Sequence, residues 1–284
     1  MILVTGANGL LGRDLLERLQ GVEVHAIVRT MPKDPVPKVK YYVLDLNEQW
    51  SVEQLPIGVK VIIHLAQSAY FRDFPDSALR IFKVNVDSTA RLLDYAKMIG
   101  VEQFIYASSG GVYGSGKKAF DENSQITSSG NLGYYLGSKL ASEILAQSYS
   151  PLMKVEVLRF FFMYGRRQNR SMLIPRLVER VKLRELVSLE GDNGIRINPI
   201  HVSDASKAVV AVLEIQSSLL INIAGSETLS IRDICLEIGR KVGEEPLFQS
   251  KVGEPSDLIA NISLMKNKLH DPEVKINTGI LDFL

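Results

Sequence analysis

The first twelve residues decide the fold: Met1-Ile2-Leu3-Val4-Thr5-Gly6-Ala7-Asn8-Gly9-Leu10-Leu11-Gly12. Ile2–Thr5 is a short apolar run of the kind found in buried strands, and three glycines follow it at intervals of three. Apolar residues at helical spacing begin at Leu10. A strand, a glycine turn and a helix in this order are typical of a unit that binds nucleotide phosphates.

The three glycines have separate roles in such a turn. Gly6 permits the tight bend, Gly9 lets the backbone approach a pyrophosphate, and Gly12 lets the helix pack closely on the strand. The N-terminus of the helix then presents unpaired N–H groups and a positive dipole end to the phosphates. The turn therefore predicts a dinucleotide-binding site.

The first 110 residues alternate short apolar runs with longer helical patterns, as βαβ units do. We expect an α/β fold, with a Rossmann-type doubly wound parallel sheet over residues 1–165 and a smaller α/β substrate lobe over 166–284. Strands are expected at Ile2–Thr5, Val22–Val28, Val39–Val43, Val59–Leu65, Gln103–Ala107 and Lys154–Phe161, and helices at Leu10–Leu19, Ala78–Met98 and Asn131–Ser148.

The second lobe is predicted to carry helices at about 173–184, 204–215 and 230–242. The helix at 204–215 is expected to pack back on the first domain. Residues after 243 look rich in loops because Pro246, Pro255 and Pro272 limit regular structure.

Composition narrows the class of protein. The 284 residues are 46% apolar and 23% charged, which is ordinary for a globular chain, and the net charge of +1 offers no general attraction for nucleic acid or an anionic membrane. Cys235 is the single cysteine, so an internal disulfide is excluded and a reducing compartment is favoured. No signal peptide or apolar run of about 18 residues is evident. We expect a soluble, cytoplasmic protein.

Tyr135 and Lys139 are the candidate catalytic pair. Their i, i+4 spacing places both side chains on one face of the helix expected at Asn131–Ser148. A phenol is a poor base at neutral pH, and a nearby ammonium is expected to lower its pKa. Tyr113 and Lys117 have the same spacing, but two glycines lie between them and disfavour a helix.

Arg29 indicates the cofactor. An acidic residue at the end of the second strand would hold the ribose 2′-hydroxyl of NAD, and Arg29 stands at this position instead. A guanidinium suits a 2′-phosphate, so the sequence favours NADP over NAD, while a solvated Arg29 and binding of either cofactor remain the alternative.

These motifs together resemble the extended short-chain dehydrogenase/reductases, the sugar-nucleotide epimerase/dehydratase group, over nearly the full chain. Asp45-Leu46 resembles the adenine-contacting pair of that group, and Val24–Arg29 resembles the corresponding stretch of its NADP-using GDP-mannose 4,6-dehydratases. The resemblance implies cofactor contacts from Gly6, Asn8, Gly9, Leu10, Leu11, Gly12, Arg29, Asp45, Leu46, Leu65, Ala66, Gln67, Asn85, Ala107, Ser108, Tyr135, Lys139 and Phe162.

The resemblance also implies roles in catalysis. Tyr135 would move a proton to or from the substrate oxygen, Lys139 would also bind the nicotinamide ribose, and Ser109 would hydrogen-bond the substrate oxygen. Substrate contacts are expected from Ser109, Gly110, Arg196 and Lys251, with a structural role as the alternative for Arg196 and Lys251. The four histidines have no metal-ligand spacing, so no metal site is predicted.

The sequence departs from the family pattern at two places. Phe162 stands where the pattern has an Asn that contacts the substrate, and an apolar ring cannot replace those hydrogen bonds. Gly110-Gly111 stands where the 4,6-dehydratases have Asp-Glu, which disfavours dehydration.

Three functions remain open. The first is an NAD(P)-dependent oxidoreductase that reduces or oxidises a carbon of a nucleotide-linked sugar. The second is an NAD-dependent sugar-nucleotide 4-epimerase, and the third is a non-catalytic NAD(P)-binding regulatory protein. The resemblance also implies a homodimer formed through the helices expected at Ala78–Met98 and Asn131–Ser148.

Overall fold

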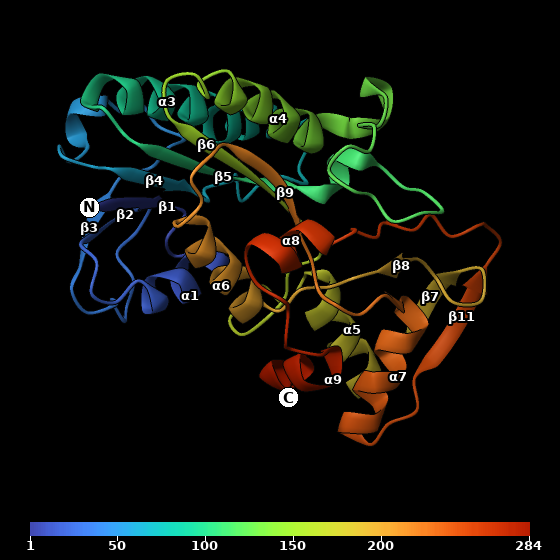
Figure 1. The fold of residues 1–284 in the computed structure, drawn as a ribbon. Helices are drawn as coiled ribbons and strands as arrows, with labels where there is room; N and C mark the ends of the chain where they lie inside the picture. Colours follow the sequence, from blue (N-terminus) through green and yellow to red (C-terminus); the bar gives the residue numbers. More distant parts are fainter. The chain divides into compact units, whose positions relative to one another are not determined.

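The fold is known from a computed structural model, which describes residues 1–284 apart from the side chain of Ser129. The chain forms two compact units that are discontinuous in sequence (Figure 1). The first unit comprises Met1–Val112, Thr127–Arg159 and Val209–Ile221, and the second comprises Tyr113–Ile126, Phe160–Ala208 and Asn222–Leu284. The sequence predicts one continuous domain before residue 165 and another after it. Each of the observed units instead consists of three separate segments of the chain.

A seven-stranded sheet forms the centre of the first unit, in the order β3-β2-β1-β4-β5-β6-β9. Its strands are β1 (Ile2–Thr5), β2 (Val24–Val28), β3 (Val39–Val43), β4 (Val61–His64), β5 (Gln103–Ser109), β6 (Lys154–Phe160) and β9 (Leu219–Ile223). Strands β1 to β5 pair in parallel. The strand order reverses between β1 and β4, and the ligand crevice of a doubly wound sheet lies at this switch point, beyond the carboxyl ends of the strands. The predicted α/β Rossmann-type fold is confirmed.

Helices cover both faces of this sheet. Helices α3 (Ser88–Ile99) and α4 (Ser129–Gln147) lie on one face and α1 (Leu10–Arg18) on the other (Figure 1). Apolar side chains from the sheet and from the α3 and α4 side, including Leu3, Leu92 and Phe104, form a buried core. This core fixes α4, which carries the candidate catalytic pair, against the sheet.

Two predicted helices are interrupted. The expected helix at Ala78–Met98 is α2 (Ala78–Phe82), a π-helical segment at Lys83–Asp87, and α3. Helix α4 has non-helical backbone at Gly133, with φ 67° and ψ 172°, a conformation open essentially to glycine alone. The regular helix that carries Tyr135 therefore begins directly after Gly133.

The second unit contains two small sheets. The parallel pair is β7 (Leu186–Glu190) with β11 (Leu247–Lys251), and the antiparallel pair is β8 (Arg196–Ile197) with β10 (Leu229–Ser230). Its helices are α5 (Leu173–Lys182), α7 (Ile231–Val242), α8 (Ser263–Lys268) and α9 (Ile276–Gly279), while α6 (Val202–Val212) is divided between the units at residue 209. Side chains of α5, α7 and the C-terminal segment share a core that includes Val178, Ile234 and Ile280.

The region after residue 243 is more regular than predicted, since it holds β11, α8 and α9. Short 3₁₀ segments occur at Val52–Gln54, Gly110–Tyr113 and Ile280–Phe283. Within the described residues, every helix is too short or too polar to cross a bilayer.

Candidate active site

The glycine turn after β1 is closely packed. A Cβ at Gly6, where φ is +67°, would lie 2.7 Å from the backbone nitrogen of Ala66, and a Cβ at Gly12 would lie 2.3 Å from the carbonyl oxygen of Gly6. No larger residue fits either position without moving the backbone. Asn8 extends the turn by donating from its amide to the carbonyl of Thr30 at 2.7 Å, which ties the turn to the residue pair after β2.

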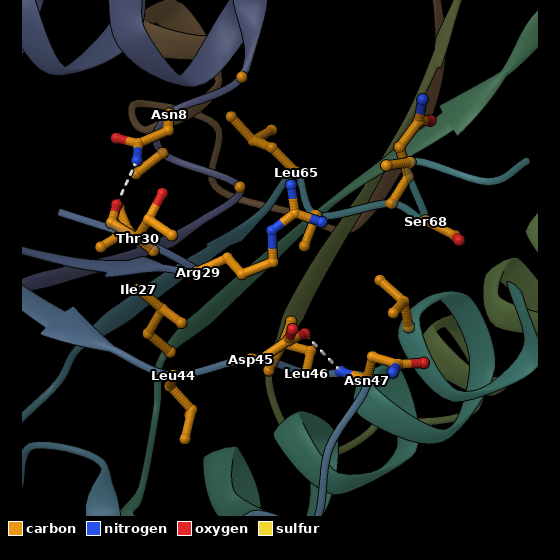
Figure 2. Close-up of a pocket in the computed structure, with 18 of the residues that line it drawn as sticks. Asn8, Ile27, Arg29, Thr30, Leu44, Asp45, Leu46, Asn47, Leu65 and Ser68 are labelled. Carbon is orange, nitrogen blue, oxygen red and sulfur yellow. Dashed lines mark hydrogen bonds between the residues drawn. The ribbon is translucent and has the colours of Figure 1, made fainter. Parts of the chain in front are cut away.

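A cavity of about 490 Å³ lies at the carboxyl ends of β1, β2, β3 and β4 (Figure 2). Its lining includes many of the predicted cofactor residues, namely Gly6, Asn8, Gly9, Arg29, Asp45, Leu46, Leu65, Ala66 and Gln67. The N-terminus of α1 begins at Gly9 on the same rim, so that backbone N–H groups are available to an anion. The cavity thus joins apolar walls to an anion-binding turn, as a dinucleotide requires.

Two cationic side chains line this cavity. Figure 2 shows the Arg29 side chain extended across it, between Asp45 and Leu65. Arg80 of α2 is the second, and its guanidinium lies 4.8 Å from the ring centroid of Tyr70. Sequence patterns gave no signal for Arg80, because its approach to the cavity depends on the segment that follows β4.

The candidate catalytic pair lies on α4, and its two polar groups have different partners. The Tyr135 hydroxyl donates to Oε1 of Gln67 at 3.0 Å, and the Tyr135 ring lies 5.1 Å from the ring of Phe71. The ammonium of Lys139 is buried and donates to the carbonyl of Ala107, at 2.8 Å, in β5. Gln67 therefore lines the cavity, as predicted, and also accepts a hydrogen bond from the candidate acid/base group.

The ionisation of this pair differs from the sequence expectation. Burial raises the pKa of Tyr135 to about 12, where a nearby ammonium was expected to lower it. Burial also lowers the pKa of Lys139 to about 8, with the Glu143 carboxylate acting in the opposite direction. The expectation was wrong because burial dominates and the Lys139 ammonium is directed to a backbone carbonyl.

A buried ion pair lies next to the Tyr135 and Lys139 pair. Glu143 follows Lys139 by one turn of α4, and its carboxylate binds the Arg159 guanidinium of β6 at 3.1 and 2.7 Å. The Ser108 hydroxyl donates to the same carboxylate. Ser108 lies between Ala107, which accepts from Lys139, and Ser109. The Glu143 carboxylate therefore joins the ends of β5 and β6 to the helix that carries Tyr135.

Ser109 ends β5 and begins the turn predicted to face the substrate. Its hydroxyl accepts from the backbone N–H of Gly111 at 3.2 Å. Gly110–Tyr113 forms a 3₁₀ turn, and a Cβ at Gly111 would lie 2.9 Å from a methyl carbon of Leu136. The Ser109 turn thus lies directly beside the residue that follows Tyr135 in the chain.

Asn85 links two segments that contribute to the candidate site. It is buried, its amide oxygen accepts from the backbone N–H of Ser68 at 2.9 Å, and its amide nitrogen donates to the Ser138 hydroxyl at 2.8 Å. The side chain predicted to touch the cofactor therefore joins the segment after β4 to α4.

His64 is a buried structural group. It contacts the hydroxyls of Thr5 at 2.6 Å and Thr89 at 3.0 Å, and burial lowers its pKa to about 3, with the charge of Lys139 adding to the effect. It remains neutral at physiological pH and holds β1, β4 and α3 together.

Three predicted ligand residues lie in the second unit. Arg196 donates from Nε and Nη2 to Asp257 at 2.8 and 2.6 Å, so its charge is already paired. Burial would raise the pKa of Asp257, but the hydrogen bonds and charge of Arg196 lower it overall. Lys251 is exposed at the end of β11. Phe162 has φ +38°, a left-handed conformation that is unusual for a bulky residue.

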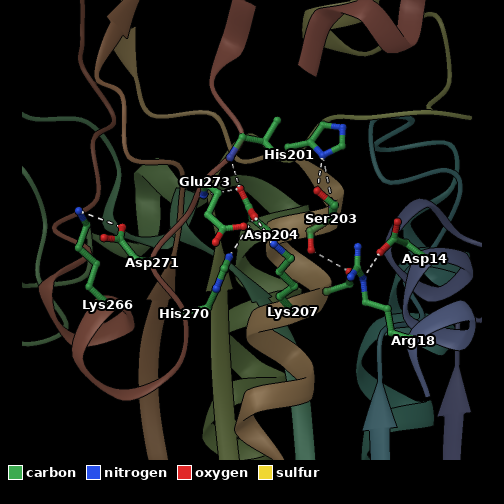
Figure 3. A network of polar contacts seen from close by, with 12 residues as sticks. Asp14, Arg18, His201, Ser203, Asp204, Lys207, Lys266, His270, Asp271 and Glu273 are labelled. Atoms are coloured by element: carbon green, nitrogen blue, oxygen red, sulfur yellow. Dashed lines mark hydrogen bonds and ion pairs between the residues drawn. The ribbon is translucent and has the colours of Figure 1, made fainter. Parts of the chain in front are cut away.

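A second polar cluster surrounds Asp204 in the second unit (Figure 3). Its buried carboxylate accepts from His270 at 3.0 Å and from the backbone N–H groups of Glu273 and Val274 at 2.9 and 2.7 Å. Lys207 lies 3.7 Å from it. Asp204, His270 and Glu273 have ligand atoms within 4.8 Å of one another, but the Asp204 oxygens already have protein donors. Asp204 holds the segment at 270–274 against α6.

The fold is that of a Rossmann-type NAD(P)-binding protein, and Ser109, Tyr135 and Lys139 are its candidate catalytic residues. Residues 2–224 match the NAD dependent epimerase/dehydratase family, and the chain belongs to this family. Membership of this family favours an NAD(P)-dependent enzyme over the regulatory alternative.

Named relatives cover nearly the whole chain. An uncharacterized UDP-glucose epimerase of Bacillus subtilis is 29% identical over 98% of this chain and 95% of its own length. A dTDP-4-dehydro-6-deoxy-D-allose reductase of Streptomyces bikiniensis is 24% identical over 98% of this chain and 93% of its own. The solved structure of a UDP-glucuronic acid 4-epimerase from Bacillus cereus, with UDP-glucuronic acid and NAD, has a TM-score of 0.84 and 25% identity, and the match covers 99% of this chain and 96% of that one.

Proposed function

We propose that this protein is an NADP-dependent reductase of a nucleotide-linked keto sugar, which it reduces at a single carbon. The observation that carries the proposal is the Tyr135 and Lys139 pair on α4. Lys139 binds the end of β5, and Tyr135 binds Gln67, which lines the cavity. A nicotinamide cofactor supplies hydride when bound. Tyr135 gives the proton to the carbonyl oxygen, and Lys139 stabilises the phenolate that remains.

Reduction at one carbon is favoured over dehydration by the residues that follow Ser109. Gly110 and Gly111 carry no carboxylate, and the 3₁₀ turn that they begin lies against Leu136. A dehydratase needs an acid and a base in this region to eliminate water. The turn can orient a substrate oxygen but cannot perform that elimination.

NADP is supported by the charges in the cavity. Arg29 and Arg80 both line it, and a guanidinium binds a phosphate through two parallel hydrogen bonds. The carboxylates in the lining, Asp45 and Glu48, come from the segment after β3 rather than from the end of β2. This distribution of charge supports a ribose that carries a 2′-phosphate.

Replacing Arg29 tests the choice of cofactor. Arg29→Asp is expected to weaken NADPH binding at least tenfold and to leave NADH binding equal or tighter, because a carboxylate repels a phosphate and accepts from a ribose hydroxyl. Lys33→Asp is the matched control, since it makes the same charge change at an exposed residue outside the cavity lining. Binding of both cofactors is measured by titration of their fluorescence. Equal losses of NADPH and NADH affinity in Arg29→Asp would contradict the assignment.

The nucleotide-linked sugar is proposed from the named relatives, which act on UDP- and dTDP-linked sugars. We assign its binding to residues 166–284. Within that region Lys251 is an exposed cation, whereas Arg196 must share its guanidinium with Asp257. Purified protein should therefore be assayed with NADPH and a panel of UDP-, dTDP- and GDP-linked 4-keto sugars. Turnover of at least one sugar is expected, with Tyr135→Phe inactive, and no turnover of any sugar would refute the proposal.

A 4-epimerase is the second candidate, and the two epimerases among the relatives favour it. An epimerase oxidises and re-reduces the same carbon, so it retains its NAD through the cycle. The cofactor released when freshly purified protein is denatured distinguishes the two. One NAD per chain would support the epimerase, and empty or NADP-bound protein would support the reductase.

We also propose a homodimer formed through α2, α3 and α4. Leu79 and Phe82 of α2, Met98 of α3 and Ile144 of α4 are exposed apolar side chains on these helices. Exposed apolar side chains on helices that pack against one another are typical of an interface. A cytoplasmic location is proposed because Cys235 is buried as a free thiol. Fractionation of source cells would test it, and export to an oxidising compartment would contradict it.

A further inference from the structure

The Tyr135 hydroxyl has a specific partner in the segment that follows β4. It donates to Oε1 of Gln67 over 3.0 Å, between residues 68 positions apart. Gln67 lines the cofactor cavity, whereas Tyr135 is absent from its lining. Gln67 therefore lies between the cavity and the candidate acid/base group, and contacts it directly.

The chemistry of an amide oxygen fixes the direction of this bond. A carbonyl oxygen can only accept, so the phenol must carry its proton while the bond exists. Lys139, which could stabilise a phenolate, directs its ammonium to the carbonyl of Ala107 instead. On another side the ring of Phe71 lies 5.1 Å from the Tyr135 ring and restricts its movement. In this arrangement the Tyr135 hydroxyl is a protonated group in a fixed position, as a proton donor must be.

We propose that Gln67 is a positioning residue that keeps the Tyr135 hydroxyl protonated and thereby prepares the site to reduce a carbonyl. This inference rests on the proposed function and makes it more specific. In the reduction, a bound nicotinamide cofactor would supply the hydride that adds to the carbonyl carbon. Tyr135 transfers its proton to the oxygen, which becomes a hydroxyl, and the resulting phenolate regains a proton from water.

The same contact disfavours the opposite direction. A dehydrogenase or an epimerase must first accept the proton of a sugar hydroxyl on the phenolate. Burial raises the pKa of Tyr135, and the bond to Gln67 is one that only the protonated phenol can donate. The titratable neighbours of this hydroxyl are Lys139 on α4 and Tyr106 on β5. Among the described residues, neither of them forms a hydrogen bond to it.

The test measures the ionisation of Tyr135 without cofactor or substrate. A fluorinated tyrosine, whose phenol is more acidic than that of tyrosine, is incorporated at position 135 of the full chain and titrated by fluorine NMR. Gln67→Leu removes the acceptor at similar size, and Gln67→Glu keeps an acceptor and adds negative charge. Asn47→Leu is the matched control, because Asn47 is an amide in the same cavity lining with its side chain bound to Glu48.

The two Gln67 variants are expected to shift the titration in opposite directions. Gln67→Leu should lower the midpoint by about one pH unit, since it removes one hydrogen bond to the neutral phenol. Gln67→Glu should raise the midpoint, and Asn47→Leu should leave it unchanged. If Gln67 had a purely structural role, the titration midpoint would shift in the same direction in both Gln67 variants or would not shift in either. Either result would overturn the inference. Because no turnover is involved, this outcome is independent of the sugar-panel assay.

Discussion

The chemistry at Tyr135 depends on protonation at neutral pH. With a pKa near 12, its phenol is fully protonated there, and Lys139, with a pKa near 8, remains largely charged. A neutral phenol can give up its proton at the moment when negative charge develops on a carbonyl oxygen. The charge on Lys139 is sustained by Glu143, whose effect opposes that of burial. This protonation agrees with the proposed reduction, in which Tyr135 gives its proton to a carbonyl oxygen.

Phe162 has an unusual conformation for its residue type. The family pattern has Asn at this position, and Asn tolerates left-handed backbone, whereas a bulky residue at φ +38° is strained. Its ring packs partly against the apolar cores of the second unit, including Phe161 and Ala260. Strain that persists in this way is often found beside ligand sites.

The strain at Phe162 can be measured by comparing two truncations. Phe162→Gly should be more stable than Phe162→Ala by about 1 kcal/mol, because both remove the ring and only glycine is free of the left-handed cost. Phe160, at the end of β6, is the control, since glycine is the poorer residue in an ordinary strand. Urea unfolding gives the free energies. Equal stability of Phe162→Ala and Phe162→Gly would contradict a strained backbone.

Strand β6 carries a buried carboxyl that is incompletely paired. Glu156 is fully buried, its Oε1 accepts from Nε2 of Gln103 at 3.1 Å, and its Oε2 is without a hydrogen-bond partner among the described residues. Burial raises the pKa of Glu156 to about 7. In the folded chain this carboxyl binds its proton more tightly than in the unfolded chain, so stability falls as the pH rises from the unfolded pKa to about 7.

Glu156→Gln is therefore expected to stabilise the protein in a pH-dependent way. At pH 8 the gain should be about 2 to 3 kcal/mol, and near pH 3 it should be close to zero, because both states are then largely protonated. Thermal unfolding of the wild type and the variant across this range is the measurement. A gain that is the same at all pH values would show that the carboxyl is not neutral in the folded state.

Elements were predictable where one local pattern decides them. The strands β1 and β3 were predicted to the residue and α1 to within one residue, since apolar periodicity and the glycine turn specify them. The π-helical segment at Lys83–Asp87 and the break at Gly133 were not predicted, because both preserve helical spacing on either side. Strand β11 was missed because its partner β7 lies about 60 residues away in the sequence.

The same distinction holds for the site. Gly6, Gly9 and Arg29 were predicted from local motifs and Asp45 from the family resemblance, and the structure places them around one cavity. The contacts that join distant segments had no sequence signal. The bond from Tyr135 to Gln67, the Glu143 pair with Arg159 and the approach of Arg80 all depend on how strands and helices meet.

Assembly of the whole molecule can be tested on its exposed apolar helices. Leu79 is 75% exposed and Ile144 is 58% exposed, so a charge at either position should be tolerated by a monomer and should disrupt a dimer. Leu79→Glu and Ile144→Glu are therefore expected to convert a dimer to a folded monomer, measured by light scattering after size exclusion. Leu186→Glu, at an exposed apolar residue of β7, is the control. A wild-type protein that is monomeric at high concentration would refute the interface.

Transfer of labelled hydride tests the central claim most directly. The protein is incubated with UDP-, dTDP- and GDP-linked 4-keto sugars and NADPH that carries deuterium at C4 of the nicotinamide, in two preparations labelled on opposite faces. A reductase should transfer deuterium from one of the two preparations into a product hydroxyl-bearing carbon, with one NADPH consumed per product. Interconversion of sugar epimers without deuterium in the product and without loss of NADPH would contradict the account.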